Sequence, residues 1–162
     1  DVYVSSEMRF HDFVFDGYTY HFVKSQMQQG VTTPQFGGGV KVTDKERTIL
    51  DSIKDMNLIA GLEETITCIG SVADVDEAKL LDYLEIYGNP FLYQKMGFIA
   101  SQYRNELNIS DEFINICKQR KGSSKRYLVN DISEPAYARD WSLVYPKHIK
   151  EMKNGVMDDA AI

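Results

Sequence analysis

Hydrophobic and polar residues follow two different periods along this chain, and the change falls near Thr43. Before that point apolar and polar side chains alternate, first in residues 1–5 and again in the segment FVFDGYTYHFVK, residues 13–24. Alternating aromatic residues on both sides of the pair Asp16-Gly17 predict a β-hairpin. The part of the chain before Thr43 is therefore expected to be rich in strands, with a further short strand through Val40 and Val42.

From Thr43 to about residue 120, apolar residues recur at helical spacing. Five helices are predicted, and they contain in order Ile49 and Ile53; Leu62 and Ile66; Leu80 and Leu84; residues 90–107; and Phe113 and Cys117. The third is expected to break at Gly88, and Pro90 suits the first turn of the fourth. Strand-like segments return at residues 126–129 and 140–146. This order predicts an α+β fold, with an aromatic hairpin first, a central helical run, and closing strands that join a mixed sheet.

Composition narrows the class of protein without naming a function. The 162 residues are 43% hydrophobic, which is enough to bury a core, and the formal net charge of −6 argues against a general affinity for nucleic acid or anionic membranes. No apolar stretch approaches the ~18 residues of a membrane span. Cys68 and Cys117 have apolar neighbours and form no CxxC pair. We therefore expect a cytoplasmic protein with two reduced, structural thiols and no membrane partner.

The ends of the chain suggest its extent. The first residue is Asp rather than Met, and strand-like alternation begins at once. We expect a C-terminal part of a longer protein, in which residues 1–155 form a single α+β domain and residues 156–162 form a frayed tail.

Common catalytic and metal-binding motifs are missing from the sequence. The glycines at 37–39 lack the lysine of a phosphate-binding loop, and GxSxG is not present. His11, His21 and His148 are widely spread and have no ligand at metal-binding spacing. The acidic stretches at 74–77 and 110–112 are explained as helix starts, where the helix dipole favours negative charge. We predict no catalytic residue, no metal and no cofactor.

One basic cluster stands out, the segment KQRKGSSKR at residues 118–126. Cations at a helix C-terminus complement the helix dipole, so a solvated helix end is one interpretation. The other is a contact with phosphate or an acidic partner, for which Lys121, Lys125 and Arg126 are the candidates. No aromatic residue is interleaved with these cations, which weakens the case for binding single-stranded nucleic acid.

A second candidate is the stretch VTDKERTILD, residues 42–51. Its T-x-x-E spacing predicts a capping box, in which the Thr43 hydroxyl accepts from the Glu46 amide and the Glu46 carboxylate accepts from the Thr43 amide. Arg47 and Asp51 are i, i+4 neighbours on one helix face and can form an ion pair. All of these residues are explained by a helix start, so composition gives no reason to consider them catalytic.

The same stretch resembles a known family. KVTDKERTILDSI is similar to the "dpERTLLDll" motif of the AbiEi family, antitoxins and transcriptional regulators of bacterial abortive-infection systems. The aromatic hairpin, the segment DEAKLLDYLEIYGNPFLYQKMGFIASQY and the closing strands KRYLVN and DWSLVYP resemble other parts of that family in the same order. The residues 94–96 before Gly97 replace an arginine-rich run, and the insert at 131–139 differs.

The resemblance implies a C-terminal antitoxin domain of a transcriptional autorepressor. In that family a winged helix-turn-helix precedes this domain and binds operator DNA, and no such segment is in this chain. The cognate toxin is nucleotidyltransferase-like, and neutralisation of the type IV kind does not need a stable complex. Glu46, Arg47 and Asp51 are then the first functional candidates, although an ion pair that braces the helix against the sheet explains the last two equally well.

Two other functions stay open from the sequence. An enzyme acting on a nucleotide or on a modified toxin target would need polar groups around a pocket, where Arg47 and Asp51 could converge with Arg104 or Arg126. Alternatively, the basic cluster could make a supporting DNA contact in a full-length repressor.

Overall fold

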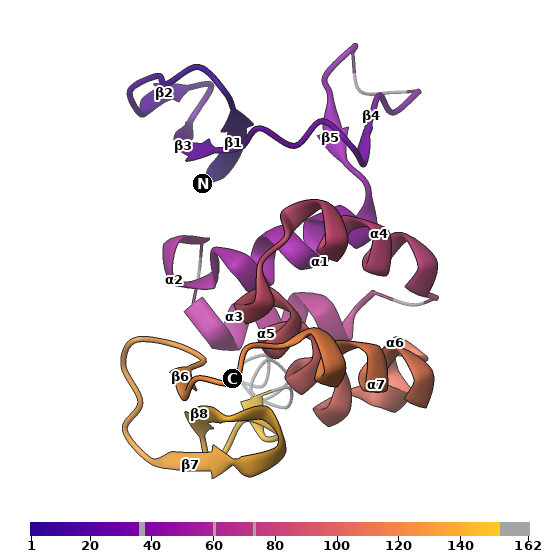
Figure 1. Ribbon diagram of the computed structural model, residues 1–162. Helices are drawn as coiled ribbons and strands as arrows, with labels where there is room; N and C mark the ends of the chain where they lie inside the picture. Colours follow the sequence, from indigo (N-terminus) through magenta and orange to yellow (C-terminus); the bar gives the residue numbers. More distant parts are fainter. Residues whose placement is uncertain (36–37, 60, 73, 153–162) are drawn as a thin grey trace, which may run out of the picture.

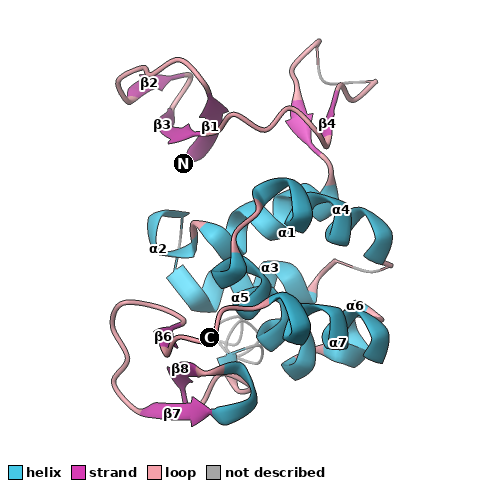
Figure 2. Ribbon diagram, viewed as in Figure 1, coloured by secondary structure: helices cyan, strands magenta, loops and turns pink. Residues whose placement is uncertain are grey.

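The computed structural model describes residues 1–35, 38–59, 61–72 and 74–152. Within them the chain has the predicted α+β fold, with small sheets on either side of a layer of helices (Figures 1 and 2). The predicted domain end at residue 155 and the tail 156–162 lie outside the described residues.

The N-terminal sheet confirms the predicted hairpin. It contains β1 (Val2–Ser6), β2 (Phe13–Phe15) and β3 (Tyr18–Lys24) in the order β1-β3-β2, with β2 antiparallel and β1 parallel to β3. Asp16 and Gly17 both have positive φ, of 50° and 80°, as a two-residue hairpin turn requires. The side chains of β2 are exposed, whereas residues 19–23 of β3 are half-buried.

A two-stranded ladder, β4 (Val31–Thr32) and β5 (Val42–Thr43), connects this sheet to the helices. The predicted strand through Val40 is thus shorter than expected. The backbone amide of Asp44 donates to the Gly30 carbonyl at 2.7 Å. This hydrogen bond continues the ladder up to Asp44, the residue directly before the first helix.

The helical layer supplies the core. Four of the five predicted helices are α1 (Lys45–Lys54), α3 (Gly61–Gly70), α4 (Glu77–Tyr87) and α7 (Asp111–Arg120). The other, expected over residues 90–107, is divided at Tyr103 into α5 (Pro90–Gln102) and a single turn, α6 (Arg104–Leu107). A further single turn, α2 (Met56–Ile59), follows α1. Every residue of α5 from 92 to 100 is buried, so this helix is central. Asp76 and Ser110 cap α4 and α7, which confirms that the two acidic stretches begin helices.

The residues that depart from the AbiEi pattern serve the core. The Gln94 amide nitrogen donates to the carbonyl oxygen of Trp141 at 2.5 Å and to that of Ser142 at 3.0 Å, and so joins α5 to the closing segment. The Lys95 ammonium lies 3.3 Å from the Ile53 carbonyl near the end of α1, and burial lowers the pKa of this lysine. Both polar side chains are buried, and backbone carbonyls accept their hydrogen bonds there.

The closing strands form their own mixed sheet. β6 (Arg126–Tyr127) runs parallel to β8 (Leu143–Pro146), and β7 (Pro135–Ala138) runs antiparallel to it, in the order β6-β8-β7. A short 3-10 turn, η1 (Arg139–Trp141), lies between β7 and β8. The third strand therefore comes from the segment that differs from the AbiEi pattern. None of these strands pairs with the N-terminal sheet among the described residues.

The two thiols have different environments. Cys117 is buried in α7, and burial raises its pKa to about 12. Cys68 is exposed and free, which differs from the expectation of two packed structural thiols.

Candidate functional site

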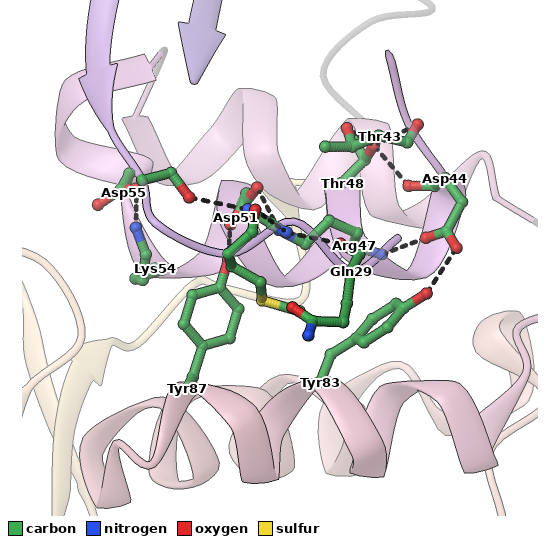
Figure 3. A network of polar contacts seen from close by, with 12 residues as sticks. Gln29, Thr43, Asp44, Arg47, Thr48, Asp51, Lys54, Asp55, Tyr83 and Tyr87 are labelled. Atoms are coloured by element: carbon green, nitrogen blue, oxygen red, sulfur yellow. Dashed lines mark hydrogen bonds and ion pairs between the residues drawn. The ribbon is translucent and has the colours of Figure 1, made fainter. Parts of the chain in front are cut away.

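The start of α1 is capped by Asp44, which is where the capping-box prediction is wrong. One carboxylate oxygen of Asp44 accepts from the Arg47 backbone amide at 2.9 Å, and the other accepts from the Tyr83 hydroxyl at 2.7 Å (Figure 3). The Lys79 ammonium on α4 lies 3.6 Å from the same carboxylate. A carboxylate caps an N-terminus at least as well as a threonine hydroxyl, and here the facing helix also holds it in place.

The two residues of the predicted capping box do other things. The Thr43 hydroxyl hydrogen-bonds the Thr48 hydroxyl at 2.7 Å. The Glu46 side chain is buried, and its carboxylate accepts from the backbone amide of Asp76 at 3.0 Å. Glu46 therefore links the start of α1 to the start of α4 instead of closing its own helix.

Arg47 makes the densest set of contacts in this part of the chain. Its side chain is 1% exposed, and its Nε donates to the Asp51 carboxylate at 2.8 Å, which confirms the predicted i, i+4 ion pair. Its two terminal nitrogens donate to the carbonyls of Met27 (3.2 Å) and Gln29 (2.8 Å) and to the Ser25 hydroxyl (3.0 Å). Arg47 thus holds the segment between β3 and β4 against α1.

Two tyrosines of α4 complete this network. The Tyr87 hydroxyl donates to the second carboxylate oxygen of Asp51, and the Arg47 guanidinium lies 5.5 Å from the centre of the Tyr87 ring (Figure 3). Burial raises the pKa of Tyr87, and the hydrogen bond to Asp51 raises it further. Burial and the hydrogen bond to Asp44 raise the pKa of Tyr83 to about 12. Both phenols are therefore neutral donors at physiological pH and cannot act as bases.

Gly30 is fitted against the same network. It has a φ of 72°, and a Cβ added there would lie 2.9 Å from the Arg47 Cβ and 3.0 Å from the Tyr83 ring. We call the set Gly30, Asp44, Glu46, Arg47, Asp51, Tyr83 and Tyr87 the α1 network. Its groups are engaged with one another and with the backbone, so the arrangement is suited to holding segments together.

A cleft of about 430 Å³ opens beside the α1 network. It lies between the segment that follows β3 and the ends of α1 and α4, and its lining residues are Lys24, Ser25, Gln26, Met27, Gln29, Lys54, Ile86 and Tyr87. The Lys54 ammonium is already paired with the Asp55 carboxylate. Its lining includes Gln29, which accepts from Arg47, and Tyr87, which donates to Asp51.

The residues considered for an enzyme site do not converge. Arg104 donates to the Ile109 carbonyl at 3.1 Å, is paired with Asp111, and lines a separate cleft with Lys150. Arg126 lies over the Phe91 ring, with 5.7 Å between the guanidinium carbon and the ring centroid. Neither Arg104 nor Arg126 lines the cleft described beside the α1 network.

The second group of candidates, Lys121, Lys125 and Arg126, lies around the connection from α7 to β6, far from the N-terminal strands (Figure 1). Two neighbouring cations are paired, Lys118 with Asp140 and Arg120 with Glu85. Lys121, Lys125 and Arg126 have no carboxylate partner within the described part of the chain. Lys125 lies near two exposed tyrosines instead, which the order of residues 118–126 did not reveal.

Several members of the α1 network were missed by the sequence reasoning. Tyr83 and Tyr87 are four residues apart and so share one face of α4, a spacing that could have marked them as a pair. Nothing in the sequence indicates that this face meets Asp44 and Asp51, since the contacts span 36 to 39 residues.

Two of the three histidines contact carboxylates. His21 contacts the carboxylates of Asp1 and Asp12, and His148 contacts those of Glu134 and Glu151. The carboxylates raise the pKa of His148. No group of three potential metal ligands was found over residues 1–35, 38–59, 61–72 and 74–152.

The helices that the structure describes are too short or too polar to cross a membrane. Comparisons with protein-family models, with characterised proteins and with solved structures found no match to this chain.

Proposed function

We propose that this chain is a non-enzymatic antitoxin domain that neutralises a nucleotidyltransferase-like toxin in a phage-defence system. In this proposal it is the C-terminal domain of a transcriptional autorepressor, whose operator contacts come mainly from an N-terminal winged helix. The basis is the resemblance of the stretch ERTILD, residues 46–51, and of the segments around it to the AbiEi family.

The observation that supports the proposal most is the structural use of these residues. Glu46 binds the start of α4, Arg47 binds the segment before β4, and Asp51 accepts from both Arg47 and Tyr87. Residues that join three segments constrain the whole fold, so a resemblance at these positions is more informative than one among exposed residues.

The same contacts favour a role without turnover. A catalytic group needs a lone pair, proton or charge that is available to a substrate. Arg47 donates to four acceptors, and the carboxylates of Asp44 and Asp51 each accept from a neutral tyrosine. These groups stabilise the native arrangement, and a ligand would have to displace existing hydrogen bonds to use them.

Growth rescue tests the proposal. The chain is co-expressed with an active nucleotidyltransferase-like toxin, which in this proposal is encoded beside its gene, and restored growth is the expected result. The Arg47→Ala variant should lose rescue to the extent that its soluble, folded fraction falls, whereas the exposed-site control Lys41→Ala should rescue fully. A well-expressed, folded wild-type chain that leaves the active toxin lethal would overturn the proposal.

A second assay separates this role from the enzyme alternative. The purified chain is incubated with the toxin-modified target, with and without Mg²⁺ or Mn²⁺, and the target is analysed by mass spectrometry. We expect no reversal of the modification in any condition. Catalytic reversal, with more than one product formed per protein molecule, would contradict the non-enzymatic proposal.

A further inference from the structure

The outer face of the C-terminal sheet carries two exposed tyrosines in one row. In the strand register Tyr127 of β6 lies opposite Val144 of β8, and Val144 lies opposite Tyr137 of β7. Residues directly opposite each other share a face of a sheet. Val144 is only 5% exposed, whereas Tyr127 and Tyr137 are 56% and 52% exposed. The two rings therefore flank a buried valine and leave much of their own surface open to a ligand.

The other face of this sheet packs on the helices. Side chains alternate between faces along a strand, so Leu143 and Tyr145 point away from the tyrosine row. Leu143 is fully buried, and the Tyr145 ring lies 4.7 Å from that of Phe98 in α5. The tyrosine row is thus held on a sheet anchored to the core and not on a loose loop.

A cation lies beside both rings. The Lys125 ammonium is 5.8 Å from the centroid of the Tyr127 ring and 5.5 Å from that of the Tyr137 ring. Within the described residues no carboxylate pairs with Lys125, Arg126 or Lys121. We call Lys125, Tyr127 and Tyr137 the tyrosine face. Arg126 lies opposite Leu143 in the register, so it points to the other face of the sheet and lies over the Phe91 ring.

We propose that the tyrosine face binds single-stranded nucleic acid. Aromatic rings on an open sheet stack with unpaired bases, and neighbouring cations contact the phosphates that join them. Lys125 lies between the two rings, where it can reach the phosphate that links two stacked bases. An acidic peptide would engage the cations but has no flat group for the rings. In a duplex the bases are already stacked on one another and cannot reach the rings.

The net charge of −6 does not oppose this site at short range. Charges separated by more than about 10 Å are largely screened at 0.1 M salt, so a bound strand interacts mainly with the nearest cations. The overall acidity removes long-range attraction, and binding is therefore expected to depend on the rings as well as on charge. This inference does not rest on the proposed antitoxin function.

Binding is tested with the whole chain and fluorescein-labelled 12-mers. Oligo-U RNA and oligo-dT DNA represent the two sources of single strand, and a 12-base-pair DNA duplex and heparin represent anions without accessible bases. Fluorescence anisotropy at 50 mM salt should show saturable binding to at least one single strand, tighter than to the duplex or heparin. Preference for RNA or for DNA identifies the source, and either supports the proposal.

Variants separate stacking from charge. Replacing both tyrosines (Tyr127→Ala, Tyr137→Ala) should weaken single-strand binding by about tenfold or more, since each stacked base is worth roughly 5- to 150-fold in affinity. The pair Tyr127→Phe, Tyr137→Phe keeps both rings and should bind within about twofold of wild type. The matched control Tyr18→Ala removes an equally exposed tyrosine from the N-terminal sheet and should have no effect.

The cations have their own readout. Each phosphate contact contributes about −0.7 to the slope of log affinity against log salt for a single strand. Lys125→Ala should therefore reduce the magnitude of the slope by about 0.7, while Lys41→Ala should leave it unchanged. Circular dichroism establishes that each variant is folded, and Lys125→Ala keeps the test decisive if the alanine pair is unstable.

Three results would overturn the proposal. The first is no saturable binding to either single strand at 50 mM salt. The second is binding to duplex or heparin as tight as to single strands. The third is unchanged affinity in both the folded tyrosine-to-alanine pair and Lys125→Ala.

Discussion

Replacing Arg47 by alanine should destabilise the protein more than replacing an exposed arginine by alanine. The side chain is 1% exposed, and its removal takes the Arg47 donor away from one oxygen of the Asp51 carboxylate and from the carbonyls of Met27 and Gln29. The substitution therefore removes one partner of a buried pair and also two hydrogen bonds to the backbone.

The expected loss follows from the burial of this pair. Removing one partner of a buried, hydrogen-bonded ion pair typically lowers the free energy of unfolding by about 3–5 kcal/mol. For a chain of this length that corresponds to a fall in Tm of about 6–20 °C. Asp51 is 19% exposed at its side chain, so partial solvation of its carboxylate favours the lower half of the range.

Urea denaturation, followed by far-UV circular dichroism and Trp141 fluorescence, measures the loss. The matched control is Arg104→Ala, because Arg104 also pairs with a carboxylate but is 46% exposed at its side chain. That control should lose less than about 1 kcal/mol, as exposed ion pairs generally do.

Hydrogen exchange shows which segments lose stability in Arg47→Ala. Arg47 joins the segment between β3 and β4 to α1, so this segment could open before the helices unfold. Backbone amides in residues 25–30 should then exchange faster in Arg47→Ala even if Trp141 reports little change. A loss below about 1 kcal/mol together with unchanged exchange in residues 25–30 would refute the reasoning.

Three further predictions use the same kinds of measurement. Gly30→Ala should lower the free energy of unfolding by about 2–4 kcal/mol, because the new Cβ meets a buried arginine and a tyrosine ring. The control Gly17→Ala, also at positive φ but with open space around it, should lower it by only about 1–2 kcal/mol. Equal losses in the two variants would show that packing at Gly30 is unimportant. Gly97→Ala should lower the free energy of unfolding by at least about 3 kcal/mol and shift the emission of the single tryptophan, because the added methyl group overlaps the indole ring. The control Gly122→Ala should change the free energy of unfolding by less than about 1 kcal/mol. Similar urea midpoints for the two variants would contradict this prediction. The pKa of Tyr83 is raised from 10 to about 12, so the folded state holds this proton more tightly than the unfolded state. The contribution of Tyr83 to stability should therefore be fully present below pH 10 and be lost between pH 10 and 12. Tyr83→Phe should make the fall of stability with pH shallower, and an unchanged slope would refute the assignment.

Some contacts of the candidate site can be predicted from local sequence, and others cannot. The ion pair of Arg47 with Asp51 was predictable, because four residues is one helical turn and the partners need no other segment. The cap was predicted one residue too early, because Thr43 and Asp44 both suit an N-terminus. The choice is made by Tyr83, which donates to the Asp44 carboxylate from a helix 39 residues away.

The tyrosine face shows the same limit. The cations at 121–126 were evident from composition, and the lack of interleaved aromatics argued against single-stranded nucleic acid. In space Tyr127 and Tyr137 flank Lys125, since β8 pairs with β6 on one side and β7 on the other. No pattern along the chain contains that pairing.

The sequence by itself therefore determined the elements whose causes are local. The Asp16-Gly17 turn, the helical periods and the helix starts at Asp76 and Ser110 depend on backbone preferences and on contacts within a few residues. Only the tertiary structure decided that Glu46 binds the start of α4, and that Tyr137 lies beside Lys125 together with Tyr127. These contacts depend on how whole elements pack to bury apolar surface, and that packing is a property of the complete chain.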